Sequence, residues 1–213
     1  MTNCIAARWL ICLRSRAIPE PKIAALVFDL DGTLVDSRLD FSLLCQRLGW
    51  PQGTAILEHL HSLPSDTERQ RASRIIEDFE LEGAQQAGWM PGAEQLLQQL
   101  AELQFPRAIL TRNMRRATAL CCQQLQIPIE LVLTREDAPA KPQPHGLWQI
   151  ADRLQLPVSQ LLYVGDYLFD LQTAANAGAR SCLFRYGDNG RFADQADFVV
   201  DDLLQLLQLL PVR

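Results

Sequence analysis

The sequence lacks the features that mark several broad classes of protein. Its 213 residues contain no run rich in Lys or Arg, and 20 basic residues face 25 acidic ones, giving a formal net charge of −5. A protein that binds nucleic acid through a basic face needs the opposite balance. No stretch reaches the roughly 20 apolar residues that a membrane-spanning helix requires. We therefore expect neither nucleic acid nor a membrane as a partner.

Paired cysteine motifs are also missing. The three histidines and six cysteines form no Cys-x-x-Cys pair and no Cys/His cluster of the kind that binds zinc; the cysteines are Cys4, Cys12, Cys45, Cys121, Cys122 and Cys182. The pattern predicts reduced thiols, several of them acting as small core residues, in a cytoplasmic protein.

Residues 1–21 differ from the rest of the chain. They carry Arg8, Arg14 and Arg16 but no acidic residue before Glu20. We expect this segment to be a poorly ordered leader, with regular structure beginning at Lys22.

Short apolar runs alternate with segments of helical period over most of the remaining chain. The runs cover 23–28, 108–111, 131–134, 161–166, 181–184 and 198–200, and the helical segments 92–104, 114–126, 144–155, 170–177 and 201–210. Continuous apolar runs are typical of strands buried on both faces of a parallel sheet. The alternation predicts an α/β fold, a Rossmann-like parallel sheet sandwiched by helices, with a core domain formed by residues 22–37 and 91–213.

One interval interrupts this alternation. Residues 38–90 show no strand-like run, only helical patterns such as Phe41-x-x-Leu44-Cys45-x-x-Leu48 and a charged stretch over 66–82. This predicts an inserted all-helical cap domain at 38–90. Because ligands of open α/β sheets bind at the carboxyl ends of the strands, a cap inserted after the first strand is placed to act as a lid.

Polar residues that could carry chemistry follow the predicted strands or lie in the loops beside them. They are Asp29, Asp31, Thr111, Lys141, Asp166 and Asp170. A parallel sheet brings these strand ends to one edge, where each close pair of carboxylates would repel by roughly 3 kcal/mol at 5 Å. Oxygen ligands without His or Cys favour a hard divalent cation, Mg²⁺ before Ca²⁺. A metal beside Lys141 and a Thr hydroxyl indicates a pocket for an anion, for which phosphate is the best fit.

Four motifs in this order resemble those of the haloacid dehalogenase superfamily, in its phosphoglycolate phosphatase-like branch. They are Asp29-Leu30-Asp31-Gly32-Thr33-Leu34-Val35-Asp36-Ser37, Leu110-Thr111-Arg112-Asn113, Lys141-Pro142-Gln143-Pro144 and Val164-Gly165-Asp166-Tyr167-Leu168-Phe169-Asp170. A single Asp-x-Asp-Gly-Thr motif is moderately specific, whereas four ordered matches with a helical insertion after the first are highly specific.

The resemblance implies a covalent mechanism. Asp29 would attack phosphorus to form an aspartyl-phosphate, while Mg²⁺ and Lys141 balance the developing charge. Asp31 would protonate the leaving group and then activate the hydrolytic water. The residues implied in phosphate binding are Gly32, Thr33, Thr111, Arg112, Asn113 and Lys141. Those implied in metal binding are Asp29, Asp31 through its main-chain carbonyl, Asp166, and Asp170 directly or through water.

The second acid also separates branches of this superfamily. Dehalogenases lack it, because a halide leaves without a proton, whereas phosphatases and phosphomutases need the acid that Asp31 supplies here. We therefore predict a Mg²⁺-dependent phosphatase that hydrolyses a small phosphorylated metabolite, as a monomer or homodimer. A phosphomutase of the same family and a phospho-accepting domain of the receiver type are the alternatives.

Overall fold

The computed structural model describes residues 22–211, and its centre is a six-stranded parallel sheet. The strand order is β5-β4-β1-β6-β7-β8. The strands are β1 (Ala25–Phe28), β4 (Arg107–Leu110), β5 (Val132–Leu133), β6 (Leu161–Gly165), β7 (Arg180–Phe184) and β8 (Phe198–Val200). Each apolar run predicted as a strand is one, which confirms the α/β fold. The leader predicted at 1–21 lies outside the described residues.

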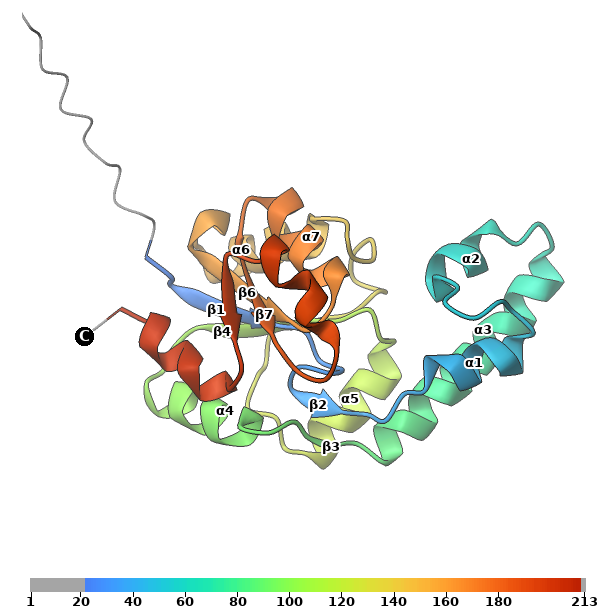
Figure 1. Ribbon diagram of the computed structural model, residues 1–213, viewed down its shortest axis with the longest axis horizontal. Coiled ribbons are helices and arrows are strands. Elements are labelled where there is room, and N and C mark those ends of the chain that lie inside the picture. Colours follow the sequence, from blue (N-terminus) through green and yellow to red (C-terminus); the bar gives the residue numbers. More distant parts are fainter. Residues whose placement is uncertain (1–21, 212–213) are drawn as a thin grey trace, which may run out of the picture.

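Helices cover both faces of this sheet, as Figure 1 shows. One face packs against α4 (Ala93–Glu102) and α5 (Arg115–Gln124), the other against α6 (His145–Leu154) and α7 (Leu168–Ala177). Successive strand residues supply the two cores alternately: Leu26 and Phe28 belong to the first, Ala25 and Val27 to the second. This alternation explains why the strand is apolar throughout.

The C-terminal segment differs from its prediction. Instead of an α-helix over 201–210, the chain forms a 3₁₀ helix, η3 (Leu203–Leu209), which begins after Asp202. Leu203 and Leu206, three residues apart, are fully buried against the first core. A period of three residues per turn aligns these two side chains on one side. The described residues also form the 3₁₀ helices η1 (Val158–Gln160) and η2 (Asn189–Gln195). None of the helices within residues 22–211 could cross a membrane.

Three helices follow the first strand and extend to one side of the α/β core (Figure 1). They are α1 (Phe41–Leu48), α2 (Ile56–Ser62) and α3 (Asp66–Gln85). Leu44, Ile76 and Phe79 form a small hydrophobic core within this unit, separate from the cores of the sheet. We refer to the unit as the helical cap.

A two-stranded antiparallel sheet joins the cap to the core. Its strands are β2 (Val35–Asp36) and β3 (Gly88–Trp89), with Val35 opposite Trp89. The expectation of no strand between 37 and 90 was therefore wrong, because strands of two residues are too short to leave an alternating pattern. The C-terminal part of α3 reaches the main core, where Ala84 packs. The predicted domain limits at 38 and 90 stay predictions.

Candidate active site

The candidate site lies at the carboxyl ends of the central strands. Asp29 directly follows β1, and its N–H donates to the carbonyl of Val164 on β6 at 2.8 Å. Thr111 directly follows β4, and its N–H donates to the carbonyl of Leu133 on β5 at 3.0 Å. These hydrogen bonds continue the ladders of the sheet. The sheet therefore determines the backbone positions of Asp29 and Thr111.

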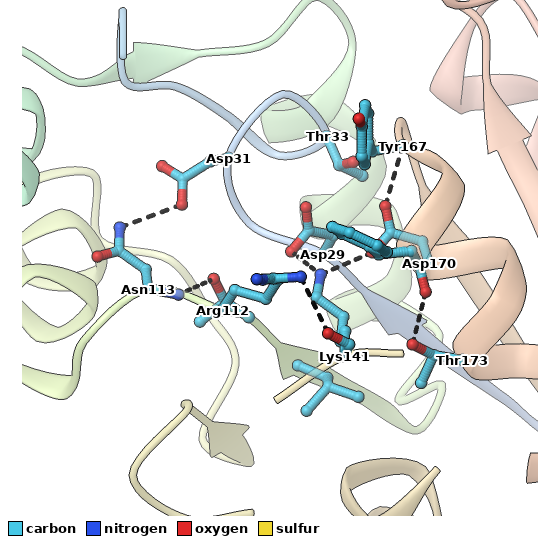
Figure 2. A network of polar contacts seen from close by, with 12 residues as sticks. Asp29, Asp31, Thr33, Arg112, Asn113, Lys141, Tyr167, Asp170 and Thr173 are labelled. Carbon is cyan, nitrogen blue, oxygen red and sulfur yellow. Dashed lines mark hydrogen bonds and ion pairs between the residues drawn. The ribbon is translucent and has the colours of Figure 1, made fainter. Parts of the chain in front are cut away.

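Three carboxylates meet at this edge. Asp29, Asp166 and Asp170 each offer an oxygen within 4.8 Å of the others. Lys141 lies among them: its Nζ is 2.7 Å from Asp29 Oδ1 and 2.6 Å from Asp170 Oδ1 (Figure 2). Asp29 is 7% exposed and Lys141 5%. The structure therefore brings together four of the residues that the sequence predicted, from three separate segments.

The cluster carries an excess of negative charge. Three carboxylates and one ammonium leave a net charge of −2 when all four groups are ionised. Burial and repulsion from Asp170 and Asp166 raise the pKa of Asp29 well above its usual value, although Lys141 opposes this. Burial and Asp170 raise the pKa of Asp166 to about 7. Burial alone would lower the pKa of Lys141, but Asp170 and Asp29 raise it.

This arrangement could bind a metal ion. Its donors are all carboxylate oxygens, the ligands that hard divalent cations prefer. A divalent cation would also balance the two surplus charges.

Gly32 allows the loop after β1 to pass close to this cluster. Its φ of +82° lies in the left-handed region, and a Cβ built there would be 2.5 Å from Asp166 Oδ2. A side chain would therefore occupy the space of the carboxylate as well as strain the backbone. The adjacent Thr33 is fully buried, with its hydroxyl 3.5 Å from Asp166 Oδ1.

Asp170 is held by several protein donors. Besides Lys141, its Oδ1 lies 3.1 Å from the Tyr163 hydroxyl, and its Oδ2 accepts from the N–H of Tyr167 at 3.0 Å, where α7 begins. The Tyr163 hydroxyl also lies 2.8 Å from the carbonyl of Leu110. Sequence reasoning missed Tyr163, although a buried hydroxyl in an otherwise apolar strand was an available signal.

Asp31 faces away from the three carboxylates. Its Oδ2 accepts a hydrogen bond from Asn113 Nδ2 at 3.1 Å, to one side of the Asp29–Lys141 pair (Figure 2). Its Oδ1 is buried without a hydrogen-bond partner within residues 22–211. Burial raises the pKa of Asp31, while Ser37 and Asn113 oppose this. The metal contact predicted for the main-chain carbonyl of Asp31 stays a prediction.

The loop after β4 joins the site to the cap. Thr111 Oγ1 accepts from the N–H of Asn113 at 3.1 Å. The Arg112 guanidinium donates to both carboxylate oxygens of Glu58 on α2 at 2.8 and 2.9 Å, and its predicted role in phosphate binding stays a prediction. It also donates to the carbonyl of Lys141 at 3.0 Å and stacks over the Phe169 ring at 4.4 Å. Arg112 therefore links the cap to the loop that contains Lys141 and to the first turn of α7.

One further residue was missed because nothing in its sequence context marks it. Asn189, in η2, donates to the carbonyl of Asp166 at 2.8 Å and to that of Phe184 at 3.0 Å. It fixes the backbone at Asp166 from a segment that contains no predicted motif.

Comparisons with known proteins agree with this geometry. The family model described as haloacid dehalogenase-like hydrolase matches residues 26–184. The chain is 31% identical to a haloacid dehalogenase-like hydrolase domain-containing protein of Arabidopsis thaliana, over 89% of this chain and 84% of that one. It is 29% identical to a phosphoglycolate phosphatase of Vibrio vulnificus, over 91% and 98%.

Solved structures have the same fold. The crystal structure of a hydrolase from Pseudomonas syringae superposes with a TM-score of 0.71 at 23% identity, covering 87% of this chain and 96% of that one. The range matched by the family model, residues 26–184, includes all four motifs and the helical cap. The chain belongs to the haloacid dehalogenase-like hydrolase family.

Proposed function

We propose that the protein is a Mg²⁺-dependent phosphatase that hydrolyses a small phosphomonoester through an aspartyl-phosphate intermediate. The observation that carries this proposal is the different setting of two carboxyl groups two residues apart. Asp29 contacts Lys141 in the buried cluster, whereas Asp31 contacts Asn113 and keeps one buried oxygen without a partner. The first setting suits a nucleophile and the second a group that gives and takes a proton.

In the first step an oxygen of Asp29 attacks phosphorus. The new O–P bond forms as the bond to the ester oxygen breaks, and its electron pair stays on that oxygen. Asp31 gives this oxygen its proton, so the leaving group departs as a neutral alcohol, the phosphoryl group stays on Asp29, and Asp31 becomes a carboxylate. Lys141, already 2.7 Å from Asp29, balances negative charge on the phosphoryl oxygens.

In the second step the same groups act in reverse. Asp31, now a carboxylate, takes a proton from the water that attacks phosphorus. The bond between phosphorus and Asp29 breaks, which releases orthophosphate and restores both carboxyl groups. The raised pKa of Asp31 suits this double role, because the group must be able to hold a proton in the resting enzyme.

The residues around the cluster fit Mg²⁺. Asp29, Asp166 and the main-chain carbonyl of Asp31 would hold the ion, with Asp170 acting through water because Lys141, Tyr163 and Tyr167 already engage its oxygens. When bound, Mg²⁺ supplies positive charge that stabilises the phosphoryl group in the transition state. Thr33, Thr111 and Asn113 are the side chains placed to orient the phosphate.

The helical cap would act as a lid over this site. Glu58 on α2 forms an ion pair with Arg112 in the loop after β4. This contact between cap and core would stabilise the cap in a closed position. The similarity to a phosphoglycolate phosphatase supports a small anionic phosphomonoester as the substrate class. Cys45, Cys121 and Cys182 are buried free thiols, which fits the cytoplasmic location that we propose. We keep the prediction of a monomer or homodimer.

A phosphate-release assay tests the proposal. The purified protein, given a panel of phosphorylated metabolites with Mg²⁺, should release orthophosphate, a chelator should stop this, and added Mg²⁺ should restore it. Transfer of the phosphate within the substrate without orthophosphate would indicate a phosphomutase instead. A protein that keeps the phosphoryl group without turnover would indicate the receiver-type alternative.

A further inference from the structure

A partly buried ion pair connects the cap helix α3 to the loop that contacts Asp31. Glu80 Oε1, on α3, is 2.6 Å from an Arg135 guanidinium nitrogen. Both side chains are shielded, with exposed fractions of 12% for Glu80 and 18% for Arg135. Burial raises the pKa of Glu80 above its usual value, although the hydrogen bond and charge of Arg135 oppose this. Shielding an ion pair from water costs desolvation free energy, which further hydrogen bonds to each group offset. The other hydrogen-bond partners of Glu80 and Arg135 therefore show what the pair holds in place.

Those partners are the two peptide groups on either side of Asn113. Glu80 Oε2 accepts from the N–H of Met114 at 3.1 Å. The same Arg135 nitrogen donates to the carbonyl of Arg112 at 2.9 Å. The backbone before and after Asn113 is therefore fixed by the two members of one ion pair.

Asn113 in turn contacts Asp31. Its Oδ1 accepts from the N–H of Met114 at 2.9 Å, which sets the orientation of the side-chain amide. Its Nδ2 then points to Asp31 Oδ2 at 3.1 Å, the contact drawn in Figure 2. A shift of the backbone around Asn113 would move this amide, and with it the carboxyl group of Asp31.

We propose that Glu80 and Arg135 are positioning residues for Asp31. They hold Asn113 so that it directs Asp31 toward the leaving oxygen of the substrate. The inference rests on the proposed function, since it concerns the group that delivers the proton. It also gives α3 a second role. The helix contributes Ile76 and Phe79 to the cap core and Glu80 to the catalytic loop, so a displaced cap would also displace the acid.

The leaving group of the substrate separates this role from a merely structural one. An alkyl phosphate needs a proton on its departing oxygen, whereas an aryl phosphate with an acidic phenol does not. A misplaced acid therefore slows the first ester much more than the second, while general damage to the fold slows both equally. A misplacement of about 1 Å can cost up to about 100-fold in rate.

The experiment compares kcat and KM of Glu80→Gln on an alkyl and an aryl phosphate. In either orientation Gln turns its NH₂ group toward another donor, the Arg135 nitrogen at the Oε1 position or the Met114 N–H at the Oε2 position. We expect kcat to fall about 10-fold on the alkyl phosphate and less than about 2-fold on the aryl phosphate, with KM unchanged. Glu82→Gln, two residues along the same helix, removes the more exposed pair with Arg47 and should change neither rate.

Asp31→Asn is the reference that separates this inference from the proposed function. If it shows no preference for the aryl phosphate, Asp31 is not the acid, and both the proposed function and this inference fail. Suppose that Asp31→Asn prefers the aryl phosphate. If Glu80→Gln then leaves both rates unchanged or slows both esters equally, only the positioning role of Glu80 and Arg135 is overturned. If circular dichroism shows that Glu80→Gln does not fold, Arg135→Met replaces it, because Met fills similar space without the nitrogen that donates to Glu80 and to the carbonyl of Arg112.

Discussion

Lys141 and Asp29, 112 positions apart in the sequence, form a buried ion pair with 2.7 Å between Nζ and Oδ1. The pair joins a loop that follows β5 to the residue directly after β1, and it places an ammonium group beside the proposed nucleophile. Asp170 on the other side of Lys141 makes the pair a triad. Three predicted site residues are thereby held at fixed positions before any substrate binds.

Removing this ammonium group should damage both stability and activity. Lys141→Met leaves Asp29 and Asp170 buried without their cation, so we expect the free energy of unfolding in chelator to fall by about 3–5 kcal/mol. Urea denaturation measures the loss. Arg47→Gln, which breaks an ion pair on the cap surface, should cost less than about 1 kcal/mol. Equal losses in the two variants would contradict a special role for the buried pair.

Gly32 should tolerate a methyl group much less well than a comparable glycine elsewhere. Gly32→Ala meets two penalties, a φ of +82° and a Cβ 2.5 Å from Asp166 Oδ2, whereas Gly53→Ala meets only a φ of +77° with no atom within 4 Å. We expect both to lose about 1–2 kcal/mol of stability from the backbone, and only Gly32→Ala to lose phosphatase activity, by about 10-fold or more. If the two variants retain equal activity, the close approach of Gly32 to Asp166 has no function.

Metal binding should stabilise the folded chain through the carboxylate cluster. A ligand that binds only the folded state adds about 1.4 kcal/mol at a free concentration about tenfold above its Kd. Thermal unfolding with and without Mg²⁺ should therefore show a rise in Tm that Asp166→Asn abolishes. Asp197→Asn removes a carboxylate that accepts from Ser181, away from the cluster, and should leave the Mg²⁺-dependent rise intact. A rise that survives Asp166→Asn would place the metal elsewhere.

Much of the fold could be predicted from the sequence because its strands are buried on both faces. Leu26 and Phe28 face one core while Ala25 and Val27 face the other, and this leaves a continuous apolar run that is easy to recognise. The short strand Gly88–Trp89 gave no such pattern. The C-terminal leucines fit both a 3.6-residue and a three-residue period, so the choice of helix type depended on packing.

The contact between Arg112 and Glu58 should link the cap to the core. A double-mutant cycle with Arg112→Gln and Glu58→Gln measures the link, because it removes effects that either change has alone. Glu58 is 47% exposed, so we expect a coupling of only about 0.5–1 kcal/mol in the free energy of unfolding. A coupling of zero would mean that the pair does not hold the cap.

The site was less predictable than the fold, for a reason that Asp31, Arg112 and Glu80 illustrate. Parallel strands determine which residues share an edge, so Asp29 and Asp166 could be grouped from their positions after apolar runs. The orientations of the Asp31 and Arg112 side chains depend on contacts between loops, which the spacing of apolar residues in the sequence does not reveal. Glu80 lies in a charged helical stretch that resembles a solvated surface, and only the packing of α3 against the core shows that this side chain is 12% exposed and paired with Arg135.

The most direct test of the mechanism is to trap the covalent intermediate. The protein is mixed with a ³²P-labelled phosphomonoester, quenched in acid within the first turnover, digested and mapped by mass spectrometry. The proposed mechanism predicts an acid-stable, base-labile phosphoryl group on Asp29, absent from Asp29→Asn. Orthophosphate release at the normal rate by Asp29→Asn, or a label on any other residue, would contradict it.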